Sequence, residues 1–242
     1  MNTDTPLTST RFTTALIDMD GVLYDSMKLH TLAWQRLMDE EHIPTRRDDF
    51  YLYEGMTGKD TINLIWRRFF GHDAPPELDK KLYERKARYF TGLGDPEVMP
   101  GAEEMLRAFA RAGVRRVLVT GSGQHSVLDR IDRDFPGLFA TADRVTAMDV
   151  KRGKPDPEPY LRGLEKAGAK AGSAIVVENA PLGVKAGKAA GCFTVAVTTG
   201  PIPREEFRKA GADLIFPSMP EFAEALPELL ANPESFKSDR YV

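Results

Sequence analysis

Short apolar runs that alternate with amphipathic stretches are the feature of this sequence that most limits its fold. After Pro100, runs rich in β-branched residues alternate with stretches that carry apolar residues at helical spacing. Strands that alternate with helices favour a mostly parallel sheet with helices on both faces. The expected strands are a run from Phe12 that Gly21 ends, Arg116–Thr120, Arg144–Thr146, Ala174–Glu178, Phe193–Val197 and Asp213–Phe216. The sequence therefore predicts an α/β fold with a doubly wound parallel sheet.

One segment interrupts this alternation. Between the first expected strand and Pro100 the pattern favours helices alone, at Ser26–His42, Arg46–Tyr53, Thr61–Phe70 and Glu77–Phe90. We interpret the segment as an α-helical cap domain inserted into a Rossmann-like core. The expected divisions are a core of residues 12–25 and 97–232, a cap of residues 26–96, and tails at 1–11 and 233–242.

The composition excludes several classes of partner. The 33 Lys+Arg and 36 Asp+Glu residues give a net charge of −3, with no clustered basic stripe, so neither nucleic acid nor an anionic membrane is expected as a partner. Cys192 is the single cysteine, which rules out an internal disulfide and fits a reducing compartment. The first residues lack the pattern of a signal peptide, and no apolar run approaches the ~18 residues that span a bilayer. We therefore expect a cytoplasmic protein.

Two carboxylates follow the first expected strand. Ligands of an open parallel sheet bind outside the carboxyl ends of the strands. Asp18 and Asp20 end the first strand, and residues two apart on a strand share a face. Two close carboxylates repel each other unless a cation or a proton lies between them, which suggests a metal, one acid as nucleophile or ligand, and one acid for proton transfer. The alternative is a solvated acidic turn before Gly21.

Three further strand ends carry polar groups. The turn Thr120–Gly123 offers a hydroxyl and free backbone N–H groups that can bind an anion, or is an ordinary turn. Lys154 can neutralise carboxylates or hold a phosphate, or is a solvated lysine. Asn179 beside Glu178 offers oxygen ligands of the kind that Mg²⁺ accepts, or caps a helix. Their common position at one sheet edge favours the functional interpretations.

The ordered set of motifs resembles that of the haloacid dehalogenase superfamily of phosphohydrolases. Residues 18–26, Asp-Met-Asp-Gly-Val-Leu-Tyr-Asp-Ser, resemble its first motif, and Thr120, Lys154 and Glu178-Asn179 stand for the second, third and fourth. A helical cap inserted after the first motif is similar to the β-phosphoglucomutase-like branch. The resemblance implies a doubly wound core and a cap that closes over the site.

The resemblance also implies roles for individual residues. Asp18 would attack phosphorus and form an aspartyl-phosphate, and Asp20 would protonate the leaving group and then take a proton from water. The Asp18 side chain, the Asp20 backbone carbonyl and Asn179 would hold Mg²⁺. The residues expected on the phosphoryl oxygens are Thr120, Gly121, Ser122 and Lys154.

Two segments, one in the core and one in the cap, depart from the family pattern. Asn179 stands where the fourth motif usually ends in an acid, so metal affinity falls unless Glu178 or the substrate compensates. In the cap, Glu54 and Gly58 stand where sugar phosphomutases carry basic residues for a second phosphate. An acid at position 54 opposes a bisphosphate, unless Glu54 is merely a solvated acid before a turn.

The cap segment at residues 54–58 and the core segments at residues 119–124 and 178–183 together resemble a sub-branch named for mutases, which includes members similar to inorganic pyrophosphatases. We therefore predict a Mg²⁺-dependent phosphohydrolase, and a monomer, acting on a small phosphorylated molecule. Pyrophosphate is favoured, a sugar phosphate is the other substrate, and β-phosphoglucomutase is the alternative activity. A phosphoaspartyl receiver and a metal-independent haloacid dehalogenase fit less well, because the chain has a cap and a second acid. His30 matches a cap-hinge histidine that contacts substrate, and Lys59, Arg67 and Lys86 are further candidates.

Overall fold

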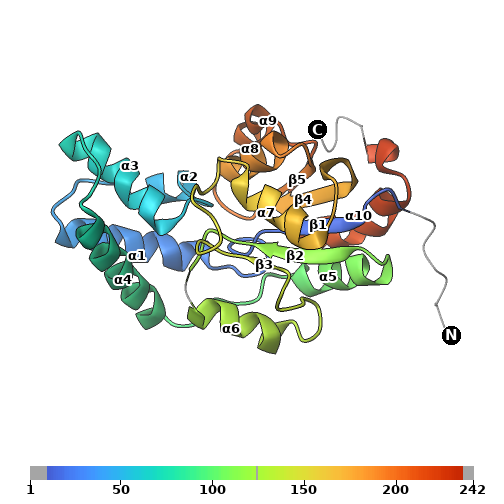
Figure 1. The fold of residues 1–242 in the computed structure, drawn as a ribbon, viewed down its shortest axis with the longest axis horizontal. Coiled ribbons are helices and arrows are strands. Elements are labelled where there is room, and N and C mark those ends of the chain that lie inside the picture. Colours follow the sequence, from blue (N-terminus) through green and yellow to red (C-terminus); the bar gives the residue numbers. More distant parts are fainter. Residues whose placement is uncertain (1–9, 124, 237–242) are drawn as a thin grey trace.

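A six-stranded parallel sheet forms the centre of the fold (Figure 1). The structure is a computed structural model that describes residues 10–123 and 125–236, without the side chains of residues 125–128. The strands, in the spatial order β3-β2-β1-β4-β5-β6, are β1 (Thr14–Ile17), β2 (Arg115–Val119), β3 (Arg144–Val145), β4 (Ala174–Glu178), β5 (Phe193–Val197) and β6 (Leu214–Phe216). This order reverses between β1 and β4, and such a reversal is where open α/β sheets bind ligands. The predicted α/β fold with a doubly wound parallel sheet is confirmed.

Helices cover both faces of the sheet. The core helices are α5 (Ala102–Arg111), α6 (His125–Asp134), α7 (Glu158–Ala167), α8 (Pro181–Ala189), α9 (Arg204–Ala210) and α10 (Met219–Ala231), with short 3₁₀ helices at Ala171–Ser173 and Pro233–Phe236. Successive strand residues point to opposite faces, so Ile17 packs in the layer with α5 and α10 whereas Leu16 packs in the layer with α7. Burial on both faces explains why the strands read as continuous apolar runs.

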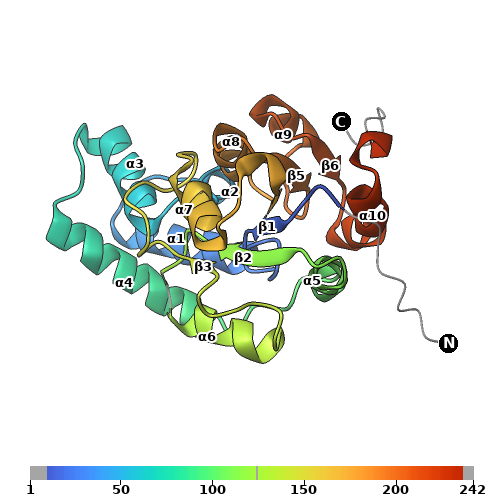
Figure 2. The same cartoon turned by 45° about the vertical axis from the view of Figure 1, so that its right-hand side comes forward.

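Four helices form the inserted segment, α1 (Met27–Glu40), α2 (Asp49–Leu52), α3 (Gly58–Phe70) and α4 (Pro76–Gly92). They enclose an apolar cluster of their own that includes Trp34, Phe50 and Trp66. The chain leaves the core after Tyr24 and returns beside it at Val98, where the two linkers pair. Figures 1 and 2 show the four helices grouped at one end of the molecule, beside the core.

Three segments differ from the sequence prediction. The helix expected at Arg46–Tyr53 is only α2, because turns occupy residues 46–48. The sequence analysis assigned nothing to α9 and α10, and α10 contains prolines at 220 and 227 that weaken a helical pattern. Residues 233–236, placed in a tail, form a 3₁₀ helix whose Phe236 is buried against Phe216, whereas residues 237–242 lie outside the described residues. Within the described ranges, no helix is both long enough and apolar enough to cross a membrane.

Candidate active site

The strands at the reversal point bring the first and fourth motifs together. β1 and β4 are neighbours in the sheet, and the backbone N–H of Asp18 donates to the Val177 carbonyl at 3.1 Å. Lys154 joins the two motifs, because its Nζ lies 2.5 Å from Asp18 Oδ1 and 2.6 Å from Glu178 Oε1. All three side chains are buried. Burial alone would lower the pKa of Lys154, but the two carboxylates outweigh it and raise that pKa, so the ammonium stays charged.

Donors surround the Glu178 carboxylate on both oxygens. Oε1 accepts from the Tyr160 hydroxyl at 2.5 Å in addition to its ion pair with Lys154. Oε2 accepts from the backbone N–H groups of Asn179 (3.1 Å) and Ala180 (3.3 Å). The carboxylate lies directly against α8, where a Cβ on Gly183 would stand 1.9 Å from Oε1. Glu178 is therefore a fixed buried anion beneath Lys154.

A chain of polar contacts joins Asp20 to the cap. Asp20 Oδ1 accepts from Ser26 Oγ at 2.5 Å and lies 3.1 Å from His30 Nε2, while His30 Nδ1 lies 2.5 Å from Lys86 Nζ. Burial raises the pKa of Asp20, but His30, the Ser26 hydroxyl and Lys86 together bring it below its ordinary value. An ionised Asp20 only accepts, so Nε2 donates and the lone pair of Nδ1 faces Lys86.

Burial lowers the pKa values of the two basic groups in this series of contacts, His30 and Lys86, whereas it raises that of Asp20. It lowers the pKa of His30, and the charge of Lys86 lowers it further. It also lowers the pKa of Lys86 to about 7, although the Asp20 charge opposes this. The His30 ring stacks on Phe90 with 4.1 Å between centroids, which fixes the imidazole between Asp20 and Lys86.

Glu54 reaches from the cap to the fourth motif. Its Oε1 accepts from Asn179 Nδ2 at 2.6 Å, and its side chain is buried. Burial raises the pKa of Glu54 well above its ordinary value, and the nearby Asp18, Asp20 and Glu178 charges add to the rise. The contact requires Gly21, whose φ is +79° and whose Cβ, if present, would lie 1.7 Å from Asn179 Nδ2. Glu54 is therefore not the solvated acid of the alternative interpretation.

The cap rests directly on two core loops. In the first, Ser122 N donates to Thr120 Oγ1 at 3.0 Å, and a Cβ on Gly121 would come within 2.9 Å of the Gly55 and Met56 carbonyl oxygens. In the second, Gly153 N donates to Asp60 Oδ2 of α3 at 3.1 Å. The cap and the core are therefore in direct contact beside the site.

Between cap and core lies a cavity of about 60 Å³. One water needs about 10–15 Å³ of cavity volume, so a cavity of this size admits only a small ligand. Its lining comprises the acids Asp18, Asp20 and Glu54, the core residues Gly121 and Ser122, the cap residues His30, Lys86, Met27, Gly55, Met56, Gly58 and Thr61, and the aromatic residues Trp34, Phe50, Tyr53 and Tyr83.

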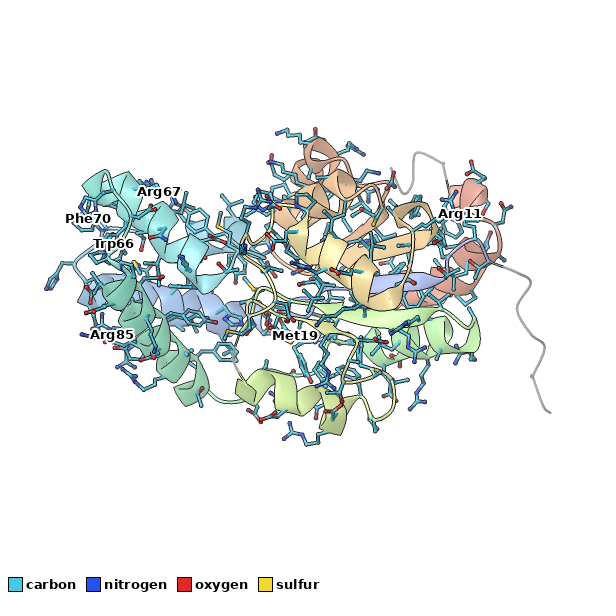
Figure 3. All side chains as sticks on the ribbon, viewed as in Figure 1. Arg11, Met19, Trp66, Arg67, Phe70 and Arg85 are labelled. Atoms are coloured by element: carbon cyan, nitrogen blue, oxygen red, sulfur yellow. The ribbon has the colours of Figure 1, made fainter. Side chains whose placement is uncertain are left out.

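The predicted residues therefore converge on one place. Six of them line the cavity (Asp18, Asp20, His30, Glu54, Gly121 and Ser122), and Thr120, Lys154 and Asn179 hydrogen-bond to lining residues. Of the further cap candidates, Lys86 lines the cavity, whereas Lys59 is exposed. Figure 3 shows Arg67 at the end of the cap far from Met19, and its guanidinium pairs with Asp73.

Sequence reasoning missed Ser26, Tyr83, Asp60 and Tyr160. Tyr83 and Lys86 lie three residues apart on α4, so they share a helix face, and Phe90 continues that face. That spacing was a usable signal. Ser26 contacts Asp20 within the first motif, whereas the contacts of Asp60 with Gly153 and of Tyr160 with Glu178 join residues distant in the chain and depend on the tertiary fold.

The oxygen atoms of the site fit a divalent cation. Asn179 Oδ1 is buried without a hydrogen-bond partner in the described part of the chain. Burial raises the pKa of Asp18 to about 8 despite Lys154, and Glu178 and Asp20 add to the rise, so the site lacks positive charge. Carboxylate, amide and carbonyl oxygens are the ligands that Mg²⁺ prefers. The amide and a carbonyl are needed, because within the described ranges no three His, Cys, Asp or Glu side chains form a metal site by themselves.

Comparisons with known proteins agree with this geometry. The family model for haloacid dehalogenase-like hydrolases matches residues 12–191. Hexitol phosphatase A of Escherichia coli (strain K12) is 31% identical over 204 residues, which cover 84% of this chain and 90% of the relative. β-Phosphoglucomutase of Bacillus subtilis (strain 168) is 25% identical over 76% of this chain and 83% of its own. A solved structure from Bacteroides vulgatus, provisionally assigned as a β-phosphoglucomutase, is 45% identical with a TM-score of 0.88, covering 95% of this chain and 92% of its own.

Proposed function

The chain belongs to the haloacid dehalogenase-like hydrolases, and we propose that it is a Mg²⁺-dependent phosphohydrolase whose favoured substrate is pyrophosphate. The observation that carries this proposal is the hydrogen bond of Asn179 to Glu54, which lines a cavity of about 60 Å³ between cap and core. An acid at this position disfavours a second anionic group bound by the protein alone but suits one that a cation bridges. The small volume favours a leaving group no larger than phosphate.

In this proposal Asp18 is the nucleophile. Its Oδ1 is held by Lys154, which leaves Oδ2 for attack on phosphorus and formation of an aspartyl-phosphate. A bound Mg²⁺ would be held by the Asp18 carboxylate, the Asp20 carbonyl and Asn179 Oδ1, and would neutralise charge on the phosphoryl oxygens. Thr120 and the backbone of Gly121 and Ser122 provide donors for the same oxygens, and the Lys154 ammonium, whose three N–H groups already have protein acceptors, provides positive charge beside Asp18.

Asp20 is the residue that transfers protons in the proposed reaction. Ser26 and His30 keep it ionised, which suits removal of a proton from the hydrolytic water. Phosphate leaves as a weaker base than a sugar alkoxide, so a pyrophosphate substrate demands less protonation from Asp20 than a sugar phosphate does. The proton state of Asp20 therefore supports the favoured substrate.

A sugar phosphate is the second candidate substrate. The identity to a hexitol phosphatase supports it, and the aromatic cap residues of the lining can pack on a sugar ring. Isomerisation by a mutase is less compatible, because a Cβ on Gly58 would stand 2.0 Å from the Tyr83 ring. A basic side chain for a second phosphate therefore has no space at position 58.

A phosphate-release screen with Mg²⁺ tests the proposal. The panel contains pyrophosphate, hexitol phosphates and hexose phosphates, with and without EDTA, and a parallel assay follows conversion of β-glucose 1-phosphate to glucose 6-phosphate. We expect the highest kcat/KM on pyrophosphate and no turnover in EDTA. Isomerisation without phosphate release would overturn the proposal, and faster hydrolysis of a hexitol phosphate would replace its substrate.

A further inference from the structure

Tyr160 is a buried residue of α7 whose hydroxyl donates to Glu178 Oε1 at 2.5 Å, and Lys154 Nζ lies over its ring, 5.2 Å from the centroid. Among the described residues, the cavity lining does not include it. We propose that Tyr160 is a positioning residue for Lys154, and that it acts by holding the Glu178 carboxylate. This inference rests on the proposed function, in which Lys154 provides positive charge beside Asp18.

The position of the Lys154 ammonium is set by its acceptors. An ammonium has three N–H donors, and Asp18 Oδ1, Glu178 Oε1 and the Val119 carbonyl (3.2 Å) accept from it. The Val119 carbonyl belongs to strand β2, whereas the two carboxylates are the ends of side chains, whose orientation depends on their own hydrogen bonds. The direction of the ammonium therefore depends on how firmly each carboxylate is held.

Of the groups that hold the Glu178 carboxylate, the Tyr160 hydroxyl is the one that contacts Oε1, the oxygen paired with Lys154. The backbone N–H groups of Asn179 and Ala180 hold Oε2, so among the described residues Oε1 has only the Tyr160 hydroxyl besides Lys154. Without that hydroxyl, Oε1 would be satisfied by the ammonium alone and would draw it away from Asp18. The hydroxyl itself is well fixed, because the Tyr160 ring packs in the apolar layer between α7 and the sheet.

Replacing the hydroxyl alone tests this inference. Tyr160→Phe keeps the ring, and the matched control is Tyr24→Phe, which removes the hydroxyl of another buried tyrosine that donates to Asp134 at 3.1 Å. We expect kcat of Tyr160→Phe to fall about tenfold with KM within about twofold, because the misplaced ammonium serves the transition state more than the ground state. Tyr24→Phe should retain the wild-type kcat, and melting curves establish that both variants are folded.

A measurement independent of turnover separates this inference from the proposed function. The ¹⁵Nζ resonance of Lys154, identified by its loss in Lys154→Arg, should shift in Tyr160→Phe and stay unchanged in Tyr24→Phe. An inactive wild-type enzyme would overturn the proposed function, while the resonance would still decide the role of Tyr160. An unchanged resonance, or equal losses of kcat in the two tyrosine variants, would overturn the positioning role.

Discussion

The part of the site in the core (Asp18, Lys154 and Glu178, the core half) and the part in the cap (Glu54 and Lys86, the cap half) differ in the charge state of their lysines. In the core half, Lys154 lies between Asp18 and Glu178, and the carboxylates raise its pKa so that it stays charged. In the cap half, burial raises the pKa of Glu54 and lowers the pKa of Lys86 to about 7, so both groups are displaced towards their neutral forms. The Lys154 ammonium is thus charged before a ligand arrives, although the raised pKa of Asp18 shows that the core half still lacks positive charge, whereas the charge of the cap half depends on what fills the cavity.

This difference suggests that the core half stabilises the transition state and that the cap half discriminates between ligands. Donors that are fixed before binding stabilise charge in the transition state of any phosphoryl transfer. Groups whose ionisation depends on the ligand can discriminate between ligands, because each ligand stabilises a different charge state. Substitutions in the core half should therefore affect every substrate alike, and substitutions in the cap half should change the relative rates.

The largest effect is expected in the core half. Asp18→Asn should lower turnover of every substrate by at least ~10³-fold, because the amide is a poor nucleophile of nearly the same shape. The matched control is Asp25→Asn in the same motif, whose carboxylate pairs with Lys28 near the surface. Phosphate release and circular dichroism of both variants check the prediction. Substantial residual activity of a folded Asp18→Asn would remove the nucleophile assignment.

The next effect concerns the cap half and depends on the substrate. Glu54→Gln should lower kcat/KM for pyrophosphate by about 10–100-fold and leave the other substrates within about threefold. Its melting temperature should not fall, because a neutral amide at this buried position avoids the burial of a charge. The exposed cap residue Glu84 provides the control Glu84→Gln. Equal losses on all substrates would abolish the distinction between the two halves.

The difference between the core half and the cap half also explains how much of the site could be predicted from the sequence. Asp18, Thr120 and Asn179 each directly follow a strand, and Lys154 lies in the loop between β3 and α7, so their order along the chain places them at one sheet edge. The Glu54 position was predicted from its motif, but its partner was not, since Asn179 lies 125 residues away. Such contacts depend on how the cap docks, which local patterns do not encode.

The sequence did not predict helices α9 and α10, for a related reason. α9 has seven residues, which is too short for a clear helical period. The role of Lys86 remained open beside Lys59 and Arg67, because three lysine or arginine side chains on helices look alike in sequence. Only packing distinguishes the buried one, and its burial has a measurable consequence.

The smallest expected effect is a pH dependence of stability that Lys86 causes. Burial places its pKa at about 7 in the folded protein, below the ordinary 10.5, so between these values the unfolded chain holds a proton that the folded chain lacks. The free energy of unfolding therefore rises with pH across this window, by about 1.4 kcal/mol per unit from this group, and the full destabilisation remains below pH 7. Lys86→Met removes this pH dependence, so the advantage of the variant over the wild type in stability should be largest at pH 6 and should decrease steadily between pH 7 and pH 9. Urea unfolding at several pH values measures this difference, with Lys80→Met, an exposed lysine of the same helix, as the control that keeps the wild-type slope. Parallel curves for wild type and Lys86→Met would mean that Lys86 stays charged in the folded cap, and the contrast between the two halves of the site would then rest on Glu54 alone.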